Sequence, residues 1–251
     1  MFKDSMLRQC QCTEAYVRTF TIPGLDAEFY QHDVSQAVSE DAYYLYLKAK
    51  CGLELETRTW AASSDLEVKY DVLDLGTGNG ILLLMLAKDF RNACFTGIEI
   101  VKELCDIAIQ NFIKLGDYLK EKMQFQIINA NYSNLEQVLT NRRFDMILSN
   151  PPYYSSGTGK LSSDFIKAVA RFEISATLVQ LLSCIKSYLA VNGKSFVVFP
   201  YSRWNEFEEN CRQLNLKINS YDFVDYKNQS FHKDIKNVNY KTKIIYELTH
   251  A

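Results

Sequence analysis

The stretch "YDVLDLGTGNGILLLMLAKDF", residues 70–90, leaves this 251-residue chain few choices of fold. A short apolar run ends at Gly76, two more glycines follow at alternate positions, and a second apolar run begins at Ile81. Glycine has no Cβ, so the backbone at such a junction can turn sharply and a ligand can approach it closely. The stretch therefore predicts a buried strand, a tight turn, and a helix that starts at the turn.

Strands and helices go on alternating after this turn. Further strands are expected at 93–100, 124–130, 144–150 and 194–200. Helices are expected at 81–90, 101–115, 133–140, 165–190 and 202–214, and Asn192-Gly193 is expected to close the fourth of them. Two last apolar runs, 216–224 and 240–248, have no helical pattern between them and are expected to pair as antiparallel strands. We therefore expect an α/β fold, a doubly wound and mostly parallel seven-stranded sheet with an antiparallel last strand, and a site at the carboxyl ends of its strands.

Composition excludes several classes of protein. Hydrophobic residues make up 47% and charged residues 23% of the chain, as in soluble globular proteins. The net charge of −2 gives no overall attraction to nucleic acid, so such a partner needs a local basic face. The seven cysteines lack disulfide or zinc spacing, and the Cys10-x-Cys12 pair has no second pair. The longest apolar run, 81–87, is too short to span a membrane. We expect a cytoplasmic monomer without metal or membrane contact.

The glycine spacing indicates which ligand the turn binds. A dinucleotide fingerprint would need a glycine at position 81, where this chain has Ile81. Alternate glycines after an acidic residue suit S-adenosylmethionine, whose amino-acid end is a zwitterion. Glu99 ends the second strand, and its carboxylate can accept hydrogen bonds from both ribose hydroxyls. The predicted cofactor-binding residues are Asp74, Gly76, Thr77, Gly78, Gly80, Glu99, Ile100, Ala130, Asn131 and Asn150.

The fourth predicted strand ends in Asn150-Pro151-Pro152-Tyr153, the candidate catalytic residues. A planar amine is a poor nucleophile because its lone pair is delocalised. Two acceptors, the Asn150 side-chain oxygen and the Pro151 carbonyl, can hold its hydrogens and turn the lone pair toward a methyl donor. Proline fixes φ, so the corner is rigid, and Tyr153 can stack on a planar group. The bland alternative is a Pro-Pro loop with surface tyrosines.

The motifs "DLGTGNG", "GIEI" and "SNPPYY" together resemble class I S-adenosylmethionine-dependent methyltransferases. Within them, the chain looks similar to the bacterial tRNA adenine-N(6) methyltransferases that act on valine tRNA beside the anticodon. The likeness covers about residues 31–200 and includes the segments 37–47 and 168–182. It implies a tRNA substrate and S-adenosylmethionine as cofactor. The substrate-binding residues would be Tyr153, Tyr154, Lys160 and Arg171, with Asn131 where the family commonly has Asp.

Residues 1–69 are interpreted as an N-terminal extension and possible cofactor lid, and residues 70–251 as the methyltransferase domain. The extension is expected to hold a hairpin, turned at Pro23-Gly24, and a helix from about 39 to 50.

Three other functions stay open at this point. A release-factor-type protein glutamine-N(5) methyltransferase shares the same amine chemistry, and so does a ribosomal RNA amine methyltransferase. A non-catalytic S-adenosylmethionine-binding subunit would share only the glycine turn. Lysines around 160–167 and 227–243 could follow RNA phosphates or simply solubilise loops.

Overall fold

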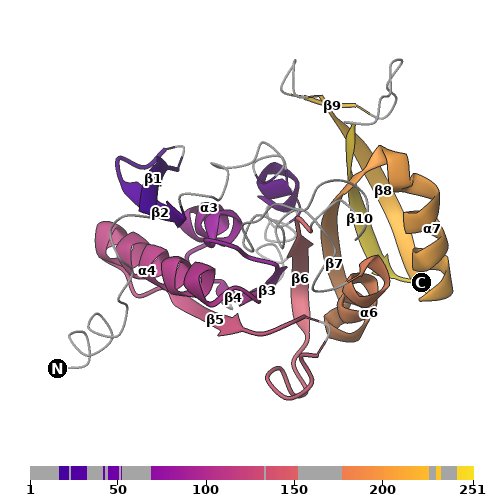
Figure 1. Cartoon of the computed structure of the whole chain (residues 1–251), viewed down its shortest axis with the longest axis horizontal. Coiled ribbons are helices and arrows are strands. Elements are labelled where there is room, and N and C mark those ends of the chain that lie inside the picture. Colours follow the sequence, from indigo (N-terminus) through magenta and orange to yellow (C-terminus); the bar gives the residue numbers. More distant parts are fainter. Residues whose placement is uncertain are drawn as a thin grey trace, which may run out of the picture.

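The structure, a computed structural model, describes residues 17–22, 24–32, 42, 45–50, 52, 69–132, 134–151, 177–225, 230–232 and 242–251. Its centre is an eight-stranded sheet with the order β5-β4-β3-β6-β7-β10-β8-β9 (Figure 1). The strands are β3 (Asp71–Leu75), β4 (Cys94–Glu99), β5 (Gln124–Asn129), β6 (Phe144–Ser149), β7 (Leu189–Pro200), β8 (Leu216–Asp225), β9 (Ser230–His232) and β10 (Lys243–His250).

The sheet confirms the predicted α/β class and its mixed directions. Strands β5, β4, β3, β6 and β7 run parallel to one another. Strand β10 runs antiparallel to both β7 and β8, so the last two apolar runs do pair as expected. The seven expected strands are all present, and β9 adds three residues at the edge beside β8.

Helices cover both faces of the sheet, which is why β3 and β6 are buried along nearly their whole length (Figure 1). Helices α3 (Ile81–Asp89) and α4 (Lys102–Leu119) supply side chains to one core cluster, together with Val72 and Phe95. Helices α6 (Leu178–Tyr188) and α7 (Trp204–Gln213, after the 3-10 turn η2, Tyr201–Arg203) supply the other, together with Leu73 and Ile147. Alternate residues of each strand therefore enter opposite cores.

The expected N-terminal hairpin is present as β1 (Val17–Thr21) and β2 (Glu28–His32), which pair antiparallel. Gly24 takes a φ of 82° in the connecting turn. Residues 45–50 are helical as predicted, and Leu45, Tyr46 and Ala49 are buried in the same core cluster as α3. Part of the N-terminal segment thus completes the core on one face of the sheet.

The helix predicted for 133–140 is wrong for residues 134–140, which form turns. One helical hydrogen bond forms, from the Leu139 N–H to the Leu135 carbonyl, and both leucines are buried. The segment stops there because Asn141 takes a positive φ of 57°. The first turn of a helix orders several residues for a single hydrogen bond, so helix nucleation is unfavourable. A single turn therefore does not extend into a helix without further packing.

The boundary after α6 also differs from the prediction. The helix ends at Tyr188 instead of residue 190, and β7 begins at once with Leu189. Asn192-Gly193 is a bulge in β7 and does not cap the helix, because the pairing jumps from Phe144–Leu189 to Met146–Lys194. A Cβ at Gly193 would lie 2.9 Å from the Phe144 carbonyl oxygen. Residues 165–176 of the predicted helix lie outside the described part of the chain.

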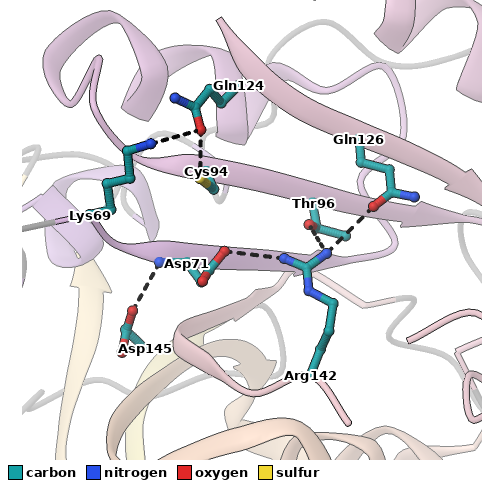
Figure 2. A network of polar contacts seen from close by, with 8 residues as sticks. All are labelled: Lys69, Asp71, Cys94, Thr96, Gln124, Gln126, Arg142 and Asp145. Atoms are coloured by element: carbon teal, nitrogen blue, oxygen red, sulfur yellow. Dashed lines mark hydrogen bonds and ion pairs between the residues drawn. The ribbon is translucent and has the colours of Figure 1, made fainter. Parts of the chain in front are cut away.

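A polar network joins the amino ends of three strands (Figure 2). The Arg142 guanidinium donates to Asp71 at 3.1 Å, to Thr96 at 3.2 Å and to Gln126 at 3.4 Å. It comes from the chain just before β6 and bridges β3, β4 and β5. Arg142 therefore fixes the strand ends that lie opposite the carboxyl edge of the sheet. Among the described helices, none is long and apolar enough to cross a membrane.

Candidate active site

Four neighbouring strands bring most of the described candidate residues to one edge of the sheet. Leu75 pairs with Ile98 on one side and with Ser149 on the other. Glu99 pairs with Asn129. Because these strands are parallel, the residues at their carboxyl ends lie in one row, in the order Asn129, Glu99, Gly76 and Asn150. A site at this edge is the usual arrangement in an open parallel sheet.

The glycine turn borders open space at its first two glycines. Gly76 and Gly78 have φ values of 81° and 57°, which glycine adopts without strain. A Cβ added to either would meet no atom within 4 Å. At Gly80 the same atom would lie 3.3 Å from the Ala108 Cβ of α4. The first two glycines therefore leave room for a ligand, whereas Gly80 permits the turn to pack against α4.

Glu99 is held in place by backbone amides. Its side chain is buried, with the residue 7% exposed, and its two oxygens accept from the Gly78 and Val101 N–H groups, both at 2.9 Å. Burial raises the pKa of this carboxyl above its ordinary value, although the nearby Val101, Gly78 and Ile100 N–H groups act to lower it. A carboxylate offers about four acceptor positions, so Glu99 can still accept two hydroxyl groups. This capacity fits the ribose of a nucleoside.

Asp74, on β3 just before the glycine turn, is the second buried carboxyl at this edge. It is 2% exposed, and burial raises its pKa to about 7. The nearby Thr77 side chain lowers that pKa, and the negative charge of Glu99 raises it. Thr77 is itself buried. A Cβ added at Gly97 would lie 2.7 Å from the Thr77 methyl group, so Gly97 leaves the space that this side chain occupies. Asp74 therefore titrates near neutral pH and would be stabilised in its ionised form by a cationic group.

The ends of β4 and β5 are tied together beside Glu99. The Asn129 amide donates to the carbonyls of Glu99 at 3.0 Å and Ile100 at 2.9 Å, and the Ala130 N–H donates to the Glu99 carbonyl at 3.0 Å. Ile100 is 39% exposed, which is high for a large apolar side chain. The half-buried Asn131 follows Ala130 in the chain. Asn129 was not among the residues singled out from the sequence.

Asn150 follows β6 directly, and Pro151 after it is buried. The Ser149 hydroxyl donates to the Leu75 carbonyl at 2.9 Å, which joins the end of β6 to the last residue of β3 before the glycine turn. Asn150 is thereby placed one strand away from Gly76. The other candidate residues, Pro152, Tyr153, Tyr154, Lys160 and Arg171, lie outside the described residues.

The sequence reasoning also missed Asn111, on α4. It is 0% exposed and donates to the Asn79 carbonyl in the glycine turn at 3.0 Å. A signal was present, because Asn111 stands at helical spacing among Ile107, Ala108 and Leu115, on the apolar face of α4. A polar residue at such a position must be hydrogen-bonded in the folded protein.

A family model described as "Methyltransferase domain" matches residues 66–236. With the strand order and the glycine turn, the match shows that the chain belongs to the class I S-adenosylmethionine-dependent methyltransferases. S-adenosylmethionine is accordingly its methyl donor. The space before Gly76 and Gly78 and the open acceptor positions of Glu99 fit that cofactor.

Within this class, the sequence is similar to proteins named tRNA1(Val) (adenine(37)-N6)-methyltransferase. The one from Shewanella woodyi is 30% identical over 67% of this chain and 69% of its own length. The one from Aliivibrio salmonicida is 26% identical over 67% of this chain and 69% of its own length. The crystal structure of a methyltransferase from Pyrococcus furiosus has the same fold, with a TM-score of 0.54 and 21% identity over 91% of this chain and 90% of that one.

Proposed function

We propose that this enzyme transfers the methyl group of S-adenosylmethionine to the exocyclic N6 amine of an adenine in tRNA. The observation that carries the proposal is the position of Asn150-Pro151, one strand away from the glycine turn at the same edge of the sheet. The names of the similar proteins support valine tRNA, beside the anticodon, as the substrate.

The proposed chemistry needs an oriented amine. S-adenosylmethionine supplies a methyl group on a positively charged sulfur. The Asn150 side-chain oxygen and the Pro151 carbonyl accept the two amine hydrogens, so that the nitrogen lone pair points at that methyl group. The carbon–nitrogen bond forms as the carbon–sulfur bond breaks, and the sulfur keeps the electron pair. The nitrogen becomes cationic and loses one proton to water. Positioning of this kind can supply a large part of the rate acceleration.

The remaining candidate residues have proposed roles. Tyr153 and Tyr154 would stack on the adenine and a neighbouring base, as aromatic side chains do with unpaired RNA bases. Lys160 and Arg171 would contact phosphates, and the arginine can do so with two hydrogen bonds. The N-terminal extension, residues 1–69, would act as a cofactor lid on the domain of residues 70–251. We also propose that the enzyme is a cytoplasmic monomer.

The acceptor is tested by incubating the purified chain with S-adenosylmethionine labelled in the methyl group. Separate reactions contain tRNA, ribosomal RNA, and release factor. We expect label only in tRNA, recovered as N6-methyladenosine on nucleoside mass spectrometry. Label in ribosomal RNA alone, or on a release-factor glutamine, would replace the tRNA proposal with one of the two enzymatic alternatives. Absence of label from all three, with the cofactor bound, would favour a binding subunit.

The corner is tested by Asn150→Ala. We expect turnover to fall by at least 100-fold, because one of the two acceptors that orient the amine is lost. The Kd for S-adenosylmethionine, measured by calorimetry, should change little. Asn150→Asp keeps an acceptor at the same place and should retain more activity than Asn150→Ala. Normal turnover by Asn150→Ala would refute the proposed role.

A further inference from the structure

Asn111 is a buried amide that joins two parts of the molecule. It lies on α4, 0% exposed, among Ile107, Ala108 and Leu115. A buried amide without partners is costly, so its hydrogen bonds decide how the groups around it are arranged. Those partners belong to the N-terminal hairpin and to the glycine turn.

The first connection is to the hairpin. The Asn111 Oδ1 accepts from the Tyr30 N–H at 2.6 Å, and its Nδ2 donates to the Tyr30 carbonyl at 2.8 Å. The side chain thus pairs with both backbone groups of one β2 residue, as a neighbouring strand would. Since Tyr30 presents one donor and one acceptor, the orientation of the amide is determined by these contacts.

The second connection is to the glycine turn. The same Nδ2 donates to the Asn79 carbonyl at 3.0 Å. Asn79 lies between Gly78 and Gly80, and its own Oδ1 accepts from the Ile81 N–H at 3.2 Å, at the start of α3. One nitrogen therefore holds the hairpin backbone and the turn backbone at once.

Other contacts seat Tyr30 close to the proposed ribose acceptor. Its ring packs against Val101, Leu104 and Ile107, and the Lys114 ammonium lies 4.6 Å from the ring centre. Val101 is the residue whose N–H donates to Glu99. The hairpin is therefore connected to the glycine turn through Asn111 and to Glu99 through Val101.

We infer that Asn111 is a positioning residue that couples docking of the β1–β2 hairpin to cofactor binding. This inference rests on the proposed placement of the cofactor at Gly76, Gly78 and Glu99. When the hairpin is docked, Asn111 holds Asn79, and the turn keeps the shape that the ligand requires. Coupling between two sites is reciprocal, so the bound cofactor must strengthen hairpin docking by the same factor.

The test measures hydrogen exchange by mass spectrometry on the full chain, with and without S-adenosylhomocysteine. In the wild-type protein, the ligand should slow exchange both in the turn, residues 76–80, and at Tyr30 in β2. In Asn111→Ala, the Kd for S-adenosylhomocysteine should rise about tenfold, a typical size for such coupling. The slowed exchange at Tyr30 should disappear, while that of the turn persists at saturating ligand.

The matched control is Leu115→Ala, one turn further along α4 at a fully buried position. It should lower the Tm and leave both the Kd and the protection of Tyr30 close to wild type. Asn111→Asp is a second variant of the same size; it keeps the acceptor for the Tyr30 N–H and loses both donated bonds, so its Kd should rise as in Asn111→Ala.

Two results would overturn the inference. One is unchanged exchange at Tyr30 when ligand binds to the wild-type protein, which needs no variant. The other is an Asn111→Ala Kd no higher than that of Leu115→Ala at an equal loss of Tm. Glu99→Ala separates this outcome from failure of the cofactor placement. If Glu99→Ala no longer binds S-adenosylhomocysteine, the proposed cofactor position stands. If it binds normally, both the proposed cofactor position and the inference about Asn111 are wrong.

Discussion

At the scale of single residues, the two buried carboxyl groups beside the glycine turn, Asp74 and Glu99, have different hydrogen-bonding surroundings. Glu99 receives two backbone N–H bonds, from Gly78 and Val101. Asp74 is as deeply buried without such amides, and its pKa rises to about 7. Carboxyl groups with raised pKa values are common at functional sites, because binding a cation or transferring a proton often requires a buried carboxyl group.

The raised pKa of Asp74 predicts how stability depends on pH. Between about pH 4 and pH 7 the folded protein keeps this proton and the unfolded chain loses it, so the free energy of unfolding should fall as pH rises through this window. The fall contributed by Asp74 is on the order of a few kcal/mol. Asp74→Asn should remove it. Urea unfolding of both proteins from pH 4.5 to 7.5 checks this, and parallel curves would contradict it.

At the scale of elements, glycines with different surroundings serve different purposes. Gly76 borders open space at the end of β3, whereas Gly193 lies against the Phe144 and Asp145 carbonyl oxygens, at 2.9 and 3.0 Å from an added Cβ. The first position leaves room for a ligand. The second lets the bulge in β7 approach β6, which ends in the proposed catalytic corner.

These two glycines make a matched pair of variants. Gly76→Ala should cost about 1–2 kcal/mol in stability, from the positive φ alone, and should raise the Kd for S-adenosylmethionine at least tenfold. Gly193→Ala should cost about 1–3 kcal/mol, because backbone atoms must move, and should leave the Kd nearly unchanged. Thermal unfolding and calorimetry on both variants check the contrast. Equal effects on affinity would mean that Gly76 does not face the cofactor.

At the scale of the whole molecule, charge limits how RNA can bind. The chain carries 28 basic and 30 acidic residues, so its overall field does not attract a polyanion. Binding of tRNA must then depend on a local set of cations, among which we propose Lys160 and Arg171. Binding to phosphates releases counterions from the RNA. This release is less favourable at high salt, so affinity that depends on phosphate contacts falls as the salt concentration rises.

We therefore expect the KM for tRNA to rise steeply between 50 and 200 mM salt, by about tenfold or more. The Kd for S-adenosylmethionine should change less than twofold, because its contacts are buried and local. Lys160→Ala and Arg171→Ala should each flatten the salt dependence of KM. A KM for tRNA that does not change with salt would argue against phosphate recognition by these residues.

Much of the fold was predictable because its signals are local. The apolar runs that became β3, β4, β6 and β7 alternate with helical patterns, and that alternation implies a parallel sheet. The prediction failed where packing against neighbouring segments determines the secondary structure. Residues 134–140 have polar helix-forming residues, but only Leu135 and Leu139 are buried, and the segment forms turns. Asn192-Gly193 has the composition of a helix end, yet contact with β6 makes it a bulge.

Short segments of the sequence are enough to indicate the class of enzyme, and they supply the residue types that we propose for its site. Glycines at alternate positions, an acidic residue at the next strand end and Asn-Pro-Pro-Tyr are each visible within a few consecutive residues. The three-dimensional fold is needed to show which glycines face open space, that burial raises the pKa of Asp74, and that Asn111 joins the hairpin to the turn. Burial and contacts between residues distant in the chain produce these properties, and no short segment encodes them.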